Sequence, residues 1–322
     1  MRNKKLEQMK QPIIIFLALI AFTATFGQKT NNKALVIIKA ENEIKFDDAP
    51  ELNIARFGFG YTSDDNFLYV SNGGSSDSQF LSSIERYNQS TNTWEFLNGG
   101  FINKRYGCLE LINEKLFIFN GSTSTSKNNV LEVYDLKENK LEVKKGSPNP
   151  VSFAGSATWK GEIYTFGGST GKYYSNRLYK YNPKSDSWTK LAKMKVKMQT
   201  QGEIINGKLY TIGGYNGKSS NKIYEYDIAT NSWNHFADLP ITISAHSTTV
   251  FEDKIWIVGD YEKLSFLAYF DPKSKEFKSY NSDMEGRRHS GCAILNNKLM
   301  IFGGNKTSKG SSLLKSVQIF QL

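Results

Sequence analysis

Side chains that build metal sites and disulfide frameworks are scarce in this sequence. Its 322 residues include two cysteines and three histidines. A metal site requires several converging ligands of suitable type, and His235, His246 and His289 offer few. We therefore expect no metal and no cofactor.

Blocks of like charge are also missing. The net charge is +10, yet the lysines are scattered, and no five or six residues of one sign follow one another. Nucleic-acid binding needs a basic stripe or patch on one face, so we expect no nucleic-acid partner. The positive balance indicates only a general attraction to acidic partners.

The apolar run near the N-terminus, residues 13–22, is short. A transmembrane helix needs roughly 18 or more apolar residues. Basic residues precede this run within residues 2–10, and small residues follow it at 23–27. This order is typical of a secretory signal peptide. We predict that residues 1–27 are removed and that residues 28–322 form one exported domain, periplasmic or secreted, without a membrane span.

The rest of the chain repeats a pattern seen best in residues 207–233, which read GKLYTIGGYNGKSSNKIYEYDIATNSW. A short apolar run ends in Gly213-Gly214. A polar loop then leads to a second run with Tyr226, and a turn leads to Trp233. Both runs are rich in β-branched and aromatic residues and are bounded by turn-forming residues, which is typical of strands.

Equivalent pairs recur along the chain at a nearly constant interval. Their second residues are Gly74, Gly121, Gly168, Gly214, Asp260 and Gly304, spaced by 47, 47, 46, 46 and 44 positions. A period in the forties with four strands per unit indicates a β-propeller. The sequence therefore predicts an all-β fold of six blades.

The pattern resembles the kelch repeat, in which a diglycine ends the second strand, a Tyr lies in the third and a Trp in the fourth. The resemblance covers residues 40–322 and implies a six-bladed kelch-type β-propeller. Repeated aromatic residues such as Tyr181, Trp188 and Trp233 would then fill the space between blades. The fold does not fix a function, because kelch propellers serve as enzymes and as binding scaffolds.

The sixth unit lacks a fourth strand, because the sequence ends soon after Phe320. A ring left in this way would expose a strand edge. We predict that an N-terminal strand within residues 35–46 pairs beside residues 317–320 and completes the last blade. Ile44 or Phe46 would stand in place of the absent Trp.

The two cysteines, Cys108 and Cys292, both fall in the first strand of a unit when the units are aligned on their glycines. They belong to the second and sixth units, with the first unit between them. We expect two free, buried thiols. A disulfide across the channel is the alternative in an oxidising compartment.

Cations recur where kelch repeats often begin the inner strand with an Arg. The residues concerned are Arg56, Lys104, Arg105, Lys197, Arg287 and Arg288. The resemblance to kelch adaptor proteins implies that such residues bind acidic peptides, since guanidinium groups form paired bonds with carboxylates. The alternative is that each cation only pairs with a neighbouring Asp or Glu.

These observations predict a monomeric binding module for a protein, peptide or glycan, acidic in character, on the loops between second and third strands. The alternative is an isomerase. Exported six-bladed kelch proteins include sialic acid mutarotases, or N-acetylneuraminate epimerases, which this chain resembles in size, export signal and blade number. Mutarotation needs a general acid and base, for which Glu110 and Glu203 are the candidates, with the arginines binding the sugar carboxylate.

Overall fold

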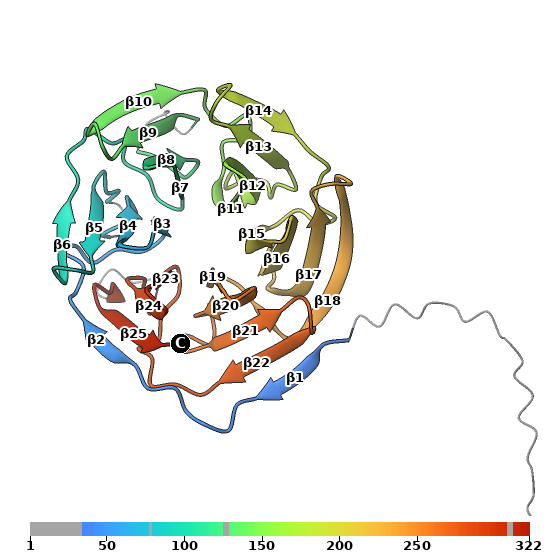
Figure 1. The fold of residues 1–322 in the computed structure, drawn as a ribbon. Helices are drawn as coiled ribbons and strands as arrows, with labels where there is room; N and C mark the ends of the chain where they lie inside the picture. The colour runs from blue at the N-terminus through green and yellow to red at the C-terminus, as the bar shows by residue number, and fades with distance from the viewer. Residues whose placement is uncertain (1–33, 77–78, 125–128, 308–311) are drawn as a thin grey trace, which may run out of the picture. The chain divides into compact units, whose positions relative to one another are not determined.

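The computed structural model describes residues 34–76, 79–124, 129–307 and 312–322. The predicted signal peptide, residues 1–27, lies outside these ranges. The described strands form six sheets, arranged as blades around a central channel (Figure 1). The predicted six-bladed, all-β propeller is confirmed. No described residue belongs to a helix with the length and apolar character of a membrane span.

Four blades consist of four consecutive strands, which run from the channel outward. Blade 1 contains β3 (Gly60–Ser63), β4 (Phe67–Ser71), β5 (Ile84–Asn88) and β6 (Thr93–Phe96). Blade 2 contains β7 (Cys108–Ile112), β8 (Lys115–Phe119), β9 (Leu131–Asp135) and β10 (Lys140–Lys144). Blade 3 contains β11 (Ser152–Trp159), β12 (Glu162–Ser169), β13 (Leu178–Asn182) and β14 (Ser187–Lys190). Blade 4 contains β15 (Gln199–Ile205), β16 (Lys208–Tyr215), β17 (Ser220–Asp227) and β18 (Ser232–Ile243).

The last two blades each include a strand from the N-terminal part of the described chain. Blade 5 contains β19 (Ser247–Phe251), β20 (Lys254–Val258), β21 (Leu267–Asp271), β22 (Glu276–Tyr280) and the added strand β1 (Val36–Lys39). Blade 6 contains β23 (Gly291–Leu295), β24 (Lys298–Phe302), β25 (Val317–Gln321) and the added strand β2 (Asp47–Ala49).

Small residues let the innermost strands converge on the channel. A Cβ atom at Gly155 of β11 would lie 2.2 Å from a ring carbon of Phe166, so a larger residue there would push the strands apart. Cys108 and Cys292 occupy inner strands β7 and β23, where both are buried and free. The expectation of two free, buried thiols is confirmed.

The repeated Tyr and Trp residues pack in pairs, as the sequence predicts. The ring centroids are 4.8 Å apart for Tyr181 and Trp188 and 5.1 Å apart for Tyr226 and Trp233. Each indole N–H donates to a backbone carbonyl in the connection that precedes the blade, 2.7 Å from Trp188 to Lys145 and 2.8 Å from Trp233 to Ala192. These hydrogen bonds join the outer strand of a blade to the connection that precedes the blade, so the two tryptophans have a structural role.

An N-terminal strand closes the ring, but it lies later in the sequence than predicted. Strand β2 pairs antiparallel with β25, with Asp47 opposite Ile319. The strand that does form within the predicted segment, residues 35–46, is β1 (Val36–Lys39), which adds in parallel to the outer strand of blade 5. Phe46 does lie against Phe320, with ring centroids 5.9 Å apart, in the place of the absent Trp.

Candidate functional site

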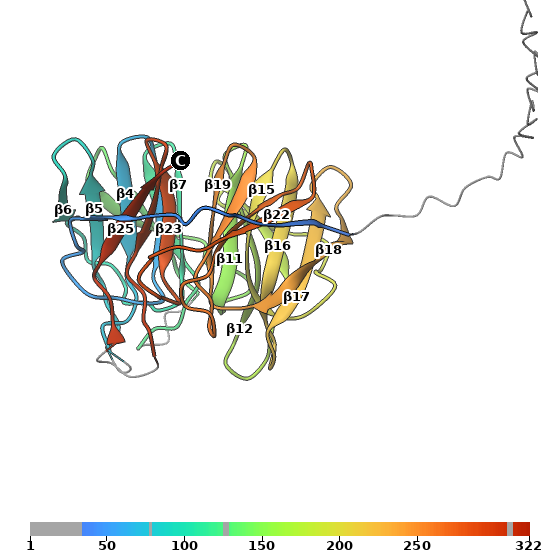
Figure 2. The ribbon, with the colours of Figure 1, turned by 90° about the horizontal axis from the view of Figure 1, so that it is seen from below.

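One face of the propeller carries the loops that follow the diglycine pairs, and we call it the loop face. In Figure 2 these loops lie at the lower edge of the propeller. Connections between blades run beside them. The Met194 N–H donates to the Asn176 carbonyl (2.9 Å) and the Met198 N–H to the Ser175 carbonyl (3.0 Å). Both kinds of segment therefore contribute to this surface.

Three of the predicted ligand-binding cations are buried and not available at the loop face. Arg56, Lys104 and Arg287 are 0% exposed. Arg56 is ion-paired with Glu85, and Lys104 with Glu132, on the third strands of their own blades. These contacts leave no surface of either cation for a ligand. Arg56 and Lys104 therefore pair with a neighbouring acid, which was the alternative to ligand binding.

Arg287 has a similar structural role with an amide in place of the acid. Its Nη1 donates to the carbonyl of Gly303 (3.1 Å), and its Nη2 donates to Gln318 Oε1 (3.2 Å). The more distant Glu285 carboxylate lies 3.6 Å from Nη2. Burial lowers the pKa of Arg287 to about 10, with Glu285 opposing the change. Arg287 thus joins the strands of blade 6 by hydrogen bonds and is not accessible to a ligand.

A signal for these buried contacts is present in the sequence, two residues before the aromatic residue of each third strand. The units that begin with a buried cation have Glu85, Glu132 or Gln318 there. The other units have Tyr or Ala at that position. The acceptor is present in each unit with a buried cation and is missing from the unit of Lys197, which is exposed.

The other three predicted cations do lie at the loop face. Lys197 is exposed. Arg288 is largely buried as well, at 7% exposed, because it stacks on Tyr261, with 3.9 Å from the guanidinium carbon to the ring centroid. Arg105 lies 4.6 Å from the centroid of Phe80. Cation–π contacts of this kind hold a guanidinium beside an aromatic ring.

Two tyrosines that are not among the predicted site residues flank the channel mouth. Tyr215 and Tyr261 directly follow two of the diglycine-type pairs, where the other units have Ser or Asn. They are 39% and 47% exposed. The replacement of a small polar residue by Tyr at the same repeat position is the signal that could have identified them.

The connection between blades 3 and 4 approaches the glycine pair that precedes Tyr215, and it carries three lysines. Met194 and Met198 are buried there and anchor the connection, while Lys193, Lys195 and Lys197 are exposed. None of the three belongs to an ion pair within the described ranges. We call the following set the tyrosine–lysine patch: Lys172, Tyr173, Tyr174, Lys193, Lys195, Lys197, Tyr215 and Tyr261.

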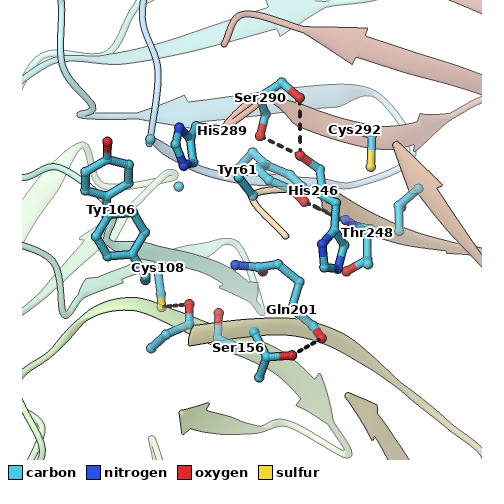
Figure 3. A pocket seen from close by; sticks show the side chains of 18 of the residues that line it. Tyr61, Tyr106, Cys108, Ser156, Gln201, His246, Thr248, His289, Ser290 and Cys292 are labelled. Atoms are coloured by element: carbon cyan, nitrogen blue, oxygen red, sulfur yellow. Dashed lines mark hydrogen bonds between the residues drawn. The ribbon is translucent and has the colours of Figure 1, made fainter. Parts of the chain in front are cut away.

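The channel contains a cavity of about 800 Å³, lined by the inner strands of all six blades (Figure 3). Glu110 of β7 and Glu203 of β15, the predicted acid and base, both line it. No Lys or Arg belongs to its lining in the described part of the chain. The arginines predicted to bind a sugar carboxylate therefore do not meet the two glutamates in this cavity.

Both cavity carboxyls are harder to ionise than usual. Burial raises the pKa of Glu110 to about 8, with a hydrogen bond from Ser156 opposing the change and the charge of Glu203 adding to it. Burial raises the pKa of Glu203 to about 7, opposed by the hydroxyl of Thr248, which donates to Glu203 Oε1 at 2.8 Å. Carboxyls in this range exchange protons near neutral pH.

Aromatic rings narrow the channel toward the loop face. Tyr106 and Phe153 stack with ring centroids 3.6 Å apart, and His289 lies 5.3 Å from Tyr106. Burial and, to a smaller extent, the charge of the nearby Arg288 lower the pKa of His289 to about 4. This ring cluster is therefore uncharged at neutral pH. Among the described residues, no three His, Cys, Asp or Glu side chains gather as metal ligands would.

Known proteins share the repeat and resemble about half of the chain in sequence. Residues 58–260 match the family model described as the KLHDC2/KLHL20/DRC7 Kelch-repeats domain. The chain is 32% identical to Kelch-like protein 25 of Xenopus tropicalis over 190 residues, which are 55% of this chain and 31% of that protein. It is 28% identical to Kelch-like protein 15 of Homo sapiens over 195 residues, 53% of this chain and 32% of that protein.

The chain spans about a third of the length of these relatives, so the likeness concerns their repeat region. The family model covers more than half of the chain, from blade 1 to the end of the second strand of blade 5. The chain therefore belongs to the kelch-repeat β-propeller family.

Proposed function

We propose that this propeller is a binding module that takes an acidic protein segment on the tyrosine–lysine patch of its loop face. The observation that carries the proposal is the combination of exposed rings and exposed lysines at one sector of the channel mouth. Tyr and basic side chains are the residues on which acidic protein ligands are commonly held. Kelch-repeat propellers as a class bind proteins, which supports the same conclusion.

The lysines give the patch its preference for negative charge. Lys193, Lys195 and Lys197 project from a connection fixed by buried methionines. Exposed cations that belong to no ion pair within the described ranges attract a segment rich in Asp or Glu. The tyrosines supply rigid apolar area at a low cost in side-chain entropy.

The mutarotase alternative is supported by Glu110 and Glu203, which share one cavity with pKa values near neutrality. A carboxylated sugar would also need a cation in that cavity, and the described lining contains none. The loop face combines suitable charge with exposed rings, so we favour the binding module.

A peptide library displayed on phage tests the proposal, because it offers segments of every charge and composition to the propeller at once. Selection on the purified protein should enrich sequences with Asp or Glu beside an apolar residue. Their binding should fall at least tenfold in the Tyr215→Ala/Tyr261→Ala variant. The matched control is Phe96→Ala combined with Val143→Ala, which removes two exposed apolar side chains outside the patch and should leave binding unchanged. Enrichment of basic sequences, or binding unchanged by loss of Tyr215 and Tyr261, would contradict the proposal.

We also propose that the protein is exported. The basic, apolar and small-residue order of residues 1–27 supports this. Residues 1–40 should be fused to a phosphatase that becomes active only after export. This fusion should give active enzyme, and substitution of Asp residues within 13–22 should abolish the activity. Full activity with the disrupted apolar run would contradict export by this segment.

A further inference from the structure

We infer that the channel holds a second binding site, which takes a small organic ammonium compound between Glu110 and Glu203. The site differs from the loop-face patch in location and in the sign of its charge. Glu110 lies on the inner strand of blade 2 and Glu203 on that of blade 4. Ser156, on blade 3 between them, also lines the cavity. One ligand can therefore face both carboxyls.

The groups that line the channel can supply negative charge near neutral pH but not positive charge. Burial raises the pKa of Tyr61 and of Cys292 and raises that of Cys108 to about 12. Burial lowers the pKa of His246 to about 4, against the opposing effects of Asp260 and the nearby Ile212 carbonyl. The pKa of His289 is lowered to about 4 as well.

These five groups are therefore neutral at pH 7, and the cations Arg105 and Arg288 lie outside the lining. Glu110 and Glu203 are the groups deep in the described channel that titrate near this pH, and Glu262 adds an exposed carboxylate near the mouth. A cation is the ligand charge that this cavity favours, because it removes the penalty of ionising the two buried carboxyls.

Polar groups without partners also face the cavity. His246 is 4% exposed, and neither of its ring nitrogens has a hydrogen-bond partner of good geometry. Figure 3 shows His246 and Gln201 extending into the same space, with Ser156 close by. A buried imidazole without a partner costs free energy that a ligand hydroxyl or N–H would recover. This observation indicates a ligand with hydrogen-bonding groups in addition to its charge.

Size and shape agree with a small molecule. A cavity of about 800 Å³ lies within the usual range for small-ligand pockets. The stacked rings of Tyr106 and Phe153 stand at the end toward the loop face. Because these rings narrow the channel, they limit the size of a ligand that enters from the loop face.

Calorimetric titration of the purified protein with glucosamine and with spermidine tests the inference. We expect saturable binding of at least one amine and at least tenfold weaker binding of N-acetylglucosamine, which has the same ring without the positive charge. Ionisation of the carboxyls should release protons, so the apparent enthalpy should differ between Tris and phosphate buffers. Glu110→Gln and Glu203→Gln should each weaken amine binding at least tenfold.

Two controls separate this site from the loop face and from unfolding. Glu138→Gln, an exposed charge change in a blade 2 turn, should leave amine binding unchanged. Lys193→Gln/Lys195→Gln/Lys197→Gln should also leave amine binding unchanged, but it should weaken the binding of the acidic peptides. Circular dichroism should show that the Glu→Gln variants melt no lower than the wild type. The inference is overturned if neither amine binds, if N-acetylglucosamine binds equally well, or if both Glu→Gln variants retain full binding.

Discussion

At the scale of single residues, the same repeat position serves two purposes in this propeller. Arg56, Lys104 and Arg287 are buried and join strands within a blade, whereas Lys197 is exposed at the loop face. The difference follows from the third strand, which offers an acid or amide acceptor only to the buried three. A cation at the start of an inner strand is therefore a surface residue only where that acceptor is missing.

The buried pair of Arg56 and Glu85 gives the first prediction. Glu85 also accepts from the backbone N–H groups of Asn53 (2.7 Å) and Ile54 (3.2 Å). Glu85→Ala should lower the free energy of unfolding by about 3–5 kcal/mol, because it leaves a buried guanidinium without its counter-charge. Urea denaturation followed by fluorescence measures this change.

Glu95 provides the matched control one strand away. It pairs with Arg86 at 2.5 Å, and its side chain is 51% exposed. Glu95→Ala should cost at most about 1 kcal/mol, as exposed ion pairs contribute little. Equal losses for the Glu85 and Glu95 variants would show that Arg56 is not held as described.

The lysines of the patch give the second prediction. Lys193→Gln/Lys195→Gln/Lys197→Gln should weaken the selected acidic peptides about tenfold or more at low salt. The loss should shrink as the salt concentration rises, because exposed charges are screened. Fluorescence anisotropy at 20 mM and 500 mM NaCl measures the binding of this variant and of a control, Lys137→Gln/Lys140→Gln, which changes the turn before β10 and the first residue of that strand. A loss that is independent of salt, or equal in the control, would count against electrostatic recognition.

At the scale of elements, the closure of the ring shows what the sequence predicts and what it does not. The spacing of the glycine pairs predicts six blades, because each unit repeats its own strand and turn chemistry. The closing strand carries no such signal, since Asp47 and Asp48 are poor strand formers. They pair with β25 because the ring geometry brings them there. The segment with strand character contributes β1, where Val36 and Ile37 are 55% and 57% exposed.

Two truncations test this division of roles. A chain that begins at Glu41 loses β1 alone and should lose little stability. A chain that begins at Glu51 also loses β2, Phe46 and the buried Ile44, and should be less stable by about 3–6 kcal/mol, given the apolar area lost. The melting temperatures of the two truncated chains measure this difference in stability. Similar melting temperatures for the two truncated chains would contradict closure by β2.

The residues of the candidate binding sites are only partly predictable from the sequence, because their positions also depend on the geometry of the ring. Glu110 and Glu203 can be identified because they lie on inner strands, and the structure places both in the channel. Tyr215 and Tyr261 escape prediction, because repeated tyrosines are usually core residues, and these two differ from the core set only in their position after the glycine pair. Which loops meet at the channel mouth depends on the ring, which no local pattern specifies.

At the scale of the whole molecule, the channel makes stability depend on pH. The pKa values of Glu110 and Glu203 rise in the fold to about 8 and about 7, from 4.5. The folded state thus keeps protons that the unfolded chain has released, so this contribution is present below pH 4.5 and is lost as the pH rises toward 8. His246 and His289, whose pKa values are lowered from 6.5 to about 4, reduce stability only as the pH falls below 6.5.

Between pH 6.5 and 8 the carboxyls therefore act without opposition from these histidines. The wild type should lose about 2–3 kcal/mol of unfolding free energy across this interval. The Glu110→Gln/Glu203→Gln variant should lose much less, because Gln does not titrate. Urea denaturation at the two pH values measures both. An equal loss in the variant would show that the channel carboxyls ionise normally.

The central claim, that the propeller binds its partner on the loop face, is tested most directly by amide hydrogen exchange with and without a selected acidic peptide. We predict slower exchange in residues 169–176, 191–198, 215–221 and 260–263, which carry the tyrosine–lysine patch. Exchange in the turns of the opposite face, at residues 113–114, 160–161 and 252–253, should not change. Slower exchange confined to those turns, with the patch segments unaffected, would contradict the proposed binding surface.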